Sequence, residues 1–167
     1  MGSRISIYID GPNLLHCGDA EGCRIDYLEK FQTFILKGRT LVDINFYNSE
    51  KRQDLGSKSF HRKLSLGGYN LKLTQLKTDQ VGVPYEKRIN TQIVADSMYD
   101  AFINKYDVAV ICSGDADLVP AIEYLLKMGK QVEVLAFSTG FSWEMRETKK
   151  KGAKIVVLSN YLQQISR

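Results

Sequence analysis

The chain has 167 residues, of which 44% are hydrophobic and 25% are charged, and its formal net charge is +4. These values are those of one globular domain over residues 1–167, and a positive balance suits an anionic partner. The three cysteines match neither a disulfide framework nor a zinc pattern, and we recognise no signal peptide or membrane-spanning stretch, so we expect a soluble, cytoplasmic protein.

The first predicted element is a buried strand at 4–9, which ends in the polar, turn-forming sequence Asp10-Gly11-Pro12-Asn13. A helix at 26–36, a strand at 41–47 and a polar helix or loop at about 50–66 follow. Further strands are expected at 69–77, 107–112, 131–137 and 154–158, and further helices at 91–105, 118–128, 141–150 and the C-terminus. This alternation predicts an α/β fold with a mainly parallel sheet that helices cover on both faces.

Acidic side chains follow two of these strands. Asp10 ends the first strand, and Asp115 and Asp117 follow the strand at 107–112 in the sequence Ser-Gly-Asp-Ala-Asp. Because the carboxyl ends of parallel strands share one edge of a sheet, we expect the three carboxylates to meet there. Gathered carboxylates repel one another unless a divalent cation neutralises them, and oxygen ligands without His or Cys favour Mg²⁺ or Mn²⁺.

Each carboxylate also has a purely structural interpretation. Asp10 could serve an Asx turn, and Asp117 is well placed to cap the following helix, whose first turn tolerates Pro120. A cap accounts for only one member of the Asp115/Asp117 pair, so convergence with Asp10 remains the better reason for Asp115. His16 is close enough in sequence to line the same edge, but a surface or core role is the expectation for it.

Four segments carry a resemblance to a known family. They are Ile7-Tyr-Ile-Asp-Gly-Pro-Asn-Leu14, Glu86-Lys-Arg-Ile-Asn90 with Asp96 six positions later, Ser113-Gly-Asp-Ala-Asp117 with Leu-Val-Pro-Ala-Ile after it, and Gly129-Lys-Gln-Val132. In this order they resemble the NYN domain of the LabA-like family, a branch of the PIN-like nucleases. The resemblance implies a PIN-like α/β/α sandwich and metal-dependent cleavage of RNA or another single-stranded nucleic acid.

The resemblance also implies site residues. Asp10, Asn13, Asp115 and Asp117 fall on the family's motif, whereas Asn90 stands where relatives usually carry Asp. An amide there can offer an oxygen to a cation but no charge, which should weaken metal affinity.

Asp96 matches a later Asp of the family. It lies nearly opposite the apolar stripe that we expect on its helix, so a solvated surface carboxylate is the alternative. The stripe comprises Val94, Met98, Ala101 and Phe102.

Basic residues supply candidate contacts to nucleic acid. Lys87 and Arg88 precede the helix of Asn90, and Trp143 precedes a basic run that includes Lys149 and Lys150. Aromatic rings among cations suit stacked bases and phosphates. The alternative is that the lysines are simply solvated and that Trp143 is half-buried.

Three classes of function are compatible with these features. A metal-dependent ribonuclease leads, and a non-catalytic nucleic-acid-binding or protein-interaction module is the alternative that Asn90 favours. An enzyme for a small phosphorylated ligand would be expected to carry a G-x-G-x-x-G or Walker-type loop, and the sequence contains neither.

Overall fold

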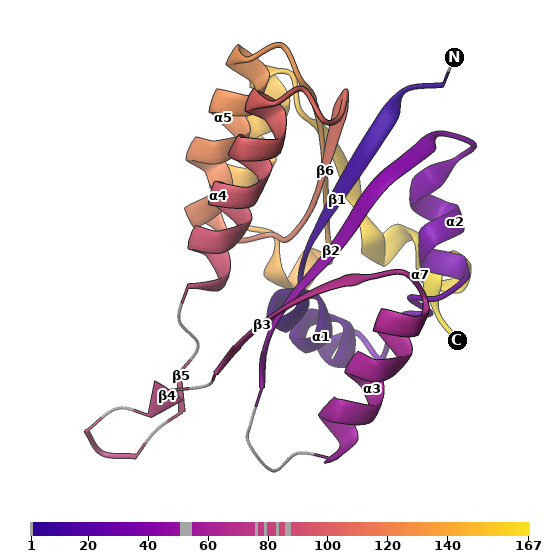
Figure 1. Ribbon diagram of the computed structural model, residues 1–167, viewed down its shortest axis with the longest axis vertical. Coiled ribbons are helices and arrows are strands. Elements are labelled where there is room, and N and C mark those ends of the chain that lie inside the picture. The colour runs from indigo at the N-terminus through magenta and orange to yellow at the C-terminus, as the bar shows by residue number, and fades with distance from the viewer. Residues whose placement is uncertain (1, 51–54, 76, 79, 83, 86–87) are drawn as a thin grey trace.

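A six-stranded parallel sheet forms the centre of the molecule (Figure 1). The structure is a computed structural model that describes residues 2–50, 55–75, 77–78, 80–82, 84–85 and 88–167. The strand order is β3-β2-β1-β6-β7-β8, so the winding direction of the sheet reverses between β1 and β6. The strands are β1 (Arg4–Asp10), β2 (Thr40–Glu50), β3 (Asn70–Gln75), β6 (Val108–Cys112), β7 (Gln131–Ala136) and β8 (Lys154–Val157).

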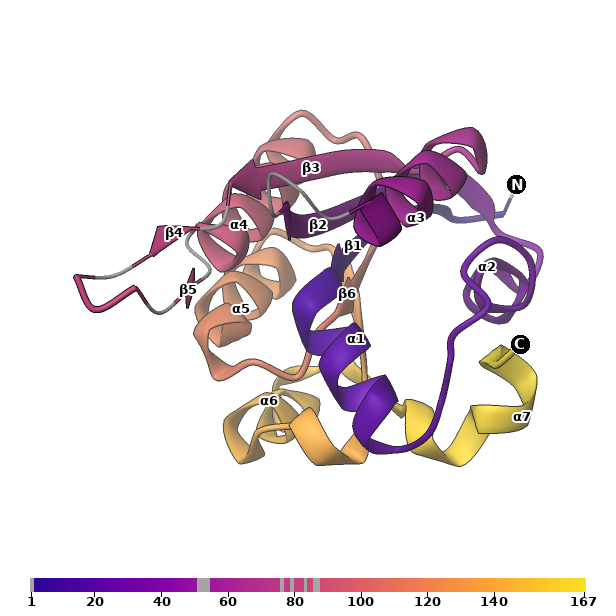
Figure 2. The same ribbon diagram turned by 90° about the horizontal axis from the view of Figure 1, so that it is seen from below.

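Helices cover both faces of this sheet (Figure 2). One face carries α1 (Gly11–Ala20), α2 (Lys30–Leu36), α3 (Leu55–Leu66) and α7 (Leu162–Ile165). The other carries α4 (Ile89–Phe102), α5 (Val119–Lys127) and α6 (Trp143–Glu147). The three-layer α/β/α arrangement expected from the alternation of apolar strands and helices is therefore confirmed.

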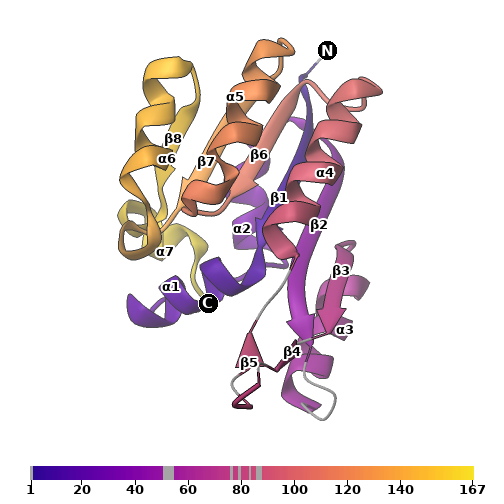
Figure 3. The same ribbon diagram turned by 90° about the vertical axis from the view of Figure 1, so that its left-hand side faces the viewer.

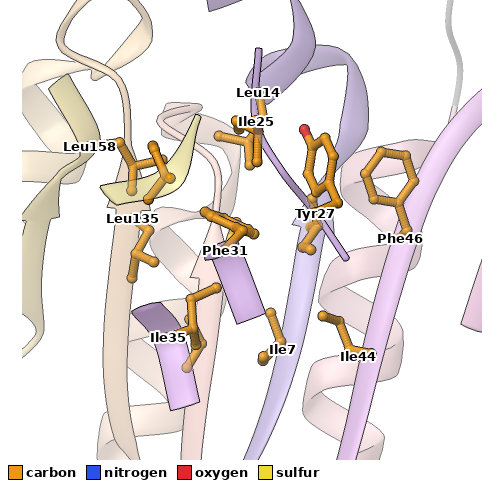
Figure 4. Close-up of a cluster of buried hydrophobic side chains, with 14 of the residues drawn as sticks. Ile7, Leu14, Ile25, Tyr27, Phe31, Ile35, Ile44, Phe46, Leu135 and Leu158 are labelled. Carbon is orange, nitrogen blue, oxygen red and sulfur yellow. The ribbon is translucent and has the colours of Figure 1, made fainter. Parts of the chain in front are cut away.

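The side chains of β1 alternate between the two layers. Ile5, Ile7 and Ile9 enter the core under α1 and α2, whereas Tyr8 enters the core under α4 and α5. Aromatic rings fill the first core beside Ile7, where Tyr27 meets Phe46 edge-to-face with ring centroids 5.4 Å apart (Figure 4). Since both faces of β1 are fully buried, the end of this strand is held in a fixed position.

Three expectations from the sequence need correction. The segment after Asp10 is not a turn, because α1 begins at Gly11 with Pro12 in its first turn, where a missing N–H is tolerated. The expected third strand ends at Gln75, and a small hairpin of β4 (Lys77–Thr78) and β5 (Pro84–Tyr85) follows it. The helix expected at 141–150 is shorter, because a 3₁₀ turn replaces it from Thr148.

The hairpin of β4 and β5 projects from the body of the molecule beside the start of α4 (Figure 3). In the part of the chain that the structure describes, no helix combines the length and the apolar character needed to cross a bilayer.

Candidate functional site

A cavity of about 520 Å³ opens at the carboxyl edge of the sheet. It lies where β1 and β6 end, which is the switch point at which doubly wound sheets bind their ligands. Figure 3 shows that α1 and α4 both begin at this edge. Six residues singled out from the sequence line the cavity: Asp10, Asn13, Arg88, Asn90, Asp115 and Asp117.

Asp10 is both the last residue of β1 and the N-cap of α1. Its Oδ1 accepts the backbone N–H of Asn13 at 3.2 Å, and its Oδ2 accepts the hydroxyl of Ser113 at 2.8 Å. The residue is only 5% exposed. The positive end of the helix dipole and the two donors stabilise this buried carboxylate in its charged form.

Ser113 links the two acidic segments. Its hydroxyl donates to Asp10 and accepts the backbone N–H of Asp115 at 3.2 Å, and the residue is fully buried. Asp115 in turn caps the short 3₁₀ helix η1 (Ala116–Leu118), because its Oδ1 accepts the N–H of Asp117 at 3.0 Å. The cap is thus Asp115, and not Asp117 as the sequence suggested.

Asn90 lies in the first turn of α4 and contacts Asp115 directly. Its Nδ2 donates to Oδ2 of Asp115 at 2.8 Å. A carboxylate only accepts hydrogen bonds, so the nitrogen of the amide must face it and the amide oxygen points elsewhere. Arg88, the exposed N-cap of α4, has a φ of 80°, a left-handed conformation that is strained for a residue with a side chain and marks a special position at the cavity.

Two hydrogen bonds of Gly114 hold the turn that carries Asp115 in place. Oδ1 of Asn13 accepts the backbone N–H of Gly114 at 3.2 Å, and the carbonyl of Gly114 accepts the N–H of Ser142, the N-cap of α6, at 3.0 Å. A Cβ atom at Gly114 would lie 1.9 Å from the carbonyl oxygen of Gly140. Only glycine allows this close approach of two backbone segments.

The donor set of the cavity fits a hard, hydrated cation. Asp10, Asp115 and Asp117 offer carboxylate oxygens, and Mg²⁺ commonly uses one or two carboxylates together with waters and substrate phosphates. Among the described residues, no three His, Cys, Asp or Glu side chains are grouped closely enough to form a metal cage. The cavity therefore suits a cation held partly by the protein and partly by substrate.

Asp96 does not line the cavity. It lies on the side of α4 that faces β2 and β3, where its Oδ2 accepts the hydroxyl of Tyr47 at 2.8 Å and lies 3.7 Å from Nζ of Lys72. The expected apolar stripe is confirmed for Ala101, which is buried, and for Val94 and Met98, which pack against the core, but it is wrong for Phe102, which is 78% exposed. The buried face of α4 consists of Ile89, Ile93, Ser97, Asp100 and Ala101.

The other candidate contacts to nucleic acid lie outside the cavity. Trp143 is 70% exposed at the start of α6, so the alternative of a half-buried ring is wrong. Lys149 and Lys150 are exposed, and Lys150 forms an ion pair with Glu147. Lys87 lies outside the described residues.

Two further residues of α1 line the cavity, His16 and Cys17; the sequence placed His16 near this edge but favoured a surface or core role for it, and it assigned no site role to Cys17. They follow Asn13 by three and four positions, which places all three on one helical face. His16 is exposed there, while burial raises the pKa of the Cys17 thiol. Recognising that α1 begins directly after Asp10 would have found both.

Fold and site together define a doubly wound, nuclease-like α/β module. The NYN domain family model matches residues 4–155, so the chain belongs to the NYN domain family. It is 25% identical to the low amplitude and bright protein LabA of Synechococcus elongatus, over 99% of this chain and 90% of that protein. A crystal structure of a Vibrio parahaemolyticus protein of unknown function has the same fold, with a TM-score of 0.78, 21% identity, and coverage of 93% of this chain and 92% of that one.

Proposed function

We propose that this protein hydrolyses phosphodiester bonds in RNA, or in another single-stranded nucleic acid, with Mg²⁺ or Mn²⁺ at the acidic cavity. The observation that carries the proposal is that Asp10, Asp115 and Asp117 line one cavity at the switch point of the sheet, with Arg88 beside them. Membership of the NYN family supports it.

In this proposal Asp10, Asp115 and Asp117 would hold the cation together with waters and substrate phosphates. A divalent cation, when bound, lowers the pKa of a coordinated water and stabilises charge on the leaving oxygen. Ser113 positions Asp10, and Asn90 positions Asp115, through their hydrogen bonds. These bonds fix the carboxylates before substrate arrives, so less reorganisation is needed during reaction.

The nucleic-acid strand would be held by Arg88 at the cavity and by aromatic and basic residues outside it. The guanidinium of Arg88 is exposed and can pair with a phosphate at the mouth. Trp143 offers a face for base stacking, and Lys149 and Lys150 add positive charge, with Lys87 proposed from the sequence. Asn13 is proposed to act indirectly, by positioning the turn at Gly114, because its Oδ1 already accepts the backbone N–H of Gly114.

A second candidate function is a nucleic-acid-binding or protein-interaction module without catalysis. The contact between Asn90 and Asp115 favours it, because an amide donor already satisfies one carboxylate oxygen that a cation would otherwise contact. The absence of a three-carboxylate cage among the described residues favours it as well. The two candidates differ in whether the cavity cleaves what it binds.

Cleavage of single-stranded RNA with Mn²⁺ separates the two candidates. We expect wild type to cleave and Asp115→Asn to lose cleavage while binding RNA as well or better, because a negative charge near the phosphates is removed. Asp19→Asn is the matched control, since it removes the same charge from the exposed end of α1 outside this cavity. Wild type that binds RNA with a steep salt dependence but cleaves nothing would replace the nuclease by the binding module.

We also propose that residues 1–167 act as one domain in the cytoplasm. The three cysteines are free and buried, which suits a reducing compartment.

A further inference from the structure

An apolar patch lies on the outer surface of α4 and α5. It is at the C-terminal ends of both helices, whereas the acidic cavity is at the start of α4. Phe102 is 78% exposed, Tyr99 is 62% exposed and Tyr124 is 56% exposed. Ile103 and Met128 extend this surface at the ends of the two helices. We call these five residues the α4–α5 patch.

The two helices that carry the patch are neighbours. Figures 1 and 3 show α4 and α5 side by side on the same face of the sheet. Their C-terminal ends are joined by Lys130, whose Nζ donates to Oδ1 of Asn104 at 2.6 Å and to the carbonyl of Tyr106 at 2.8 Å. Both the α4 residues and the α5 residues of the patch occupy the last two turns, so they lie at the same level along the pair.

The orientation of α5 directs its apolar residues toward α4. Glu123 lies on the side of α5 that faces the 3₁₀ turn after α6, where it pairs with Lys151 of that turn. The next residue, Tyr124, is turned by about 100° on the helix, away from that ion pair and from the buried side chains of Ile122 and Leu125. The ring of Tyr124 therefore borders the outer face of α4.

The chemistry of the patch favours an apolar partner. Lysines border the patch. Nζ of Lys127 lies 4.8 Å from the ring centroid of Tyr124, and Lys130 lies between the ends of α4 and α5, where it bonds Asn104 and Tyr106. Two lysines are too little charge for a nucleic-acid strand, which is held by several phosphate contacts. The five patch side chains themselves carry no charge, so the same surface on a second copy can face them.

The exposed area reaches the size of a specific contact. At roughly 200 Å² for a fully exposed side chain of this size, the five residues present about 570 Å². Two copies would therefore bury about 1,100 Å² in total, which exceeds the roughly 1,000 Å² expected of a biological interface. An apolar surface of several hundred Å² is typical of a protein-protein contact.

We propose that two copies of this chain associate through the α4–α5 patch in a two-fold dimer. The two helices run in the same direction, since each leads from the carboxyl edge of the sheet to the opposite edge. A two-fold axis through the patch pairs them antiparallel with their copies in a four-helix layer, and leaves both acidic cavities open at the carboxyl edges. The proposal does not depend on whether the cavity is catalytic.

Sedimentation velocity between about 1 and 100 µM tests the proposal. We expect wild type to reach twice the 18.9 kDa mass of the chain, and Phe102→Glu and Tyr124→Glu to remain monomeric with unchanged circular dichroism. Leu66→Glu is the matched control and should dimerise like wild type, because Leu66 is 80% exposed on α3, across the sheet.

Three results would overturn the dimer. Wild type that stays monomeric at 100 µM would exclude it, and a dimer that survives both patch substitutions would place the contact elsewhere. If wild type is monomeric and the patch variants, but not Leu66→Glu, bind RNA more weakly, the patch is a base-stacking surface instead.

Discussion

The side-chain amide of Asn90 donates a hydrogen bond of 2.8 Å to Oδ2 of Asp115. This contact joins the first turn of α4 to the acidic turn after β6, and it satisfies one carboxylate oxygen of the cavity. A neutral donor therefore occupies the position where a cation or a second carboxylate could lie. The two proposed functions, cleavage and binding alone, make different predictions for this amide.

The substitution Asn90→Asp should raise the affinity for Mn²⁺. Without metal, the new carboxylate would face Asp115 at hydrogen-bond distance, so repulsion should lower the melting temperature or favour a shared proton. A cation between the two would relieve that repulsion. Calorimetric titration with Mn²⁺, with melting curves at each concentration, measures both effects. Equal Mn²⁺ affinity in the two forms would mean that position 90 does not face the metal.

The substitution Ser113→Ala should destabilise the protein by about 1–3 kcal/mol, because it removes a hydrogen bond to the buried carboxylate of Asp10. It should also reduce any RNA cleavage, since Asp10 loses a group that orients it. Urea unfolding gives the free energy. Ser65→Ala, on the exposed side of α3, serves as the control and should change it by less than about 0.5 kcal/mol. A Ser113 variant as stable as the control would contradict the positioning role.

The substitution Gly114→Ala should cost at least about 2 kcal/mol, because a Cβ atom would lie 1.9 Å from the carbonyl oxygen of Gly140 and backbone cannot give way as a side chain does. Separation of the two segments should also disturb the bond between Ser142 and Gly114. Thermal unfolding measures the loss. A melting temperature equal to that of wild type would show that the two segments do not approach so closely in solution.

Arg4 and Asp107 predict a specific response to acid. A hydrogen bond from the guanidinium of Arg4 lowers the pKa of Asp107 from 3.8 to about 2. Because this pKa is depressed in the folded state, the pair stabilises the protein above about pH 4, and the contribution is lost as the pH falls toward 2. In Arg4→Met the pKa of Asp107 should return toward 3.8, as carboxyl NMR shifts would report. An unchanged titration curve would contradict the contact.

Arg88 should contribute one phosphate contact. Replacement of Arg88 by Ala is expected to weaken RNA binding and to reduce the slope of log affinity against log salt by about one, because one fewer counterion is released. Binding isotherms at several salt concentrations give this slope. Arg24→Ala provides the comparison, since Arg24 is exposed and does not line the acidic cavity. The same slope in both variants would remove Arg88 from the binding surface.

The sheet and the acidic turn after β6 could be predicted from the sequence. Buried parallel strands are continuous apolar runs, and the run at 107–112 ends directly at Ser113. On the α1 side of the cavity Asn13 was predicted, but Cys17 was not, because Asp10-Gly-Pro-Asn is typical of a turn and not of a helix start. Here the same residues start a helix, since Asp10 caps it and Pro12 needs no hydrogen-bond partner there.

The last turn of α4 could not be predicted from the sequence. Hydrophobicity placed Phe102 inside, yet the buried face includes Asp100, whose Oδ2 accepts the hydroxyl of Tyr8 at 2.8 Å. A buried acid whose partner lies 92 positions away cannot be recognised from local periodicity. Phe102 is exposed instead and belongs to the α4–α5 patch.

The position of a bound Mn²⁺ ion tests the account's central claim most directly. Crystals soaked in Mn²⁺, with a non-cleavable single-stranded RNA, should give an anomalous peak in the cavity, about 2.2 Å from carboxylate oxygens of Asp10, Asp115 or Asp117. The same soak of Asp115→Asn should lose or weaken the peak. A wild-type cavity that holds the RNA but no Mn²⁺, or an ion bound only at other carboxylates, would contradict a metal-dependent nuclease.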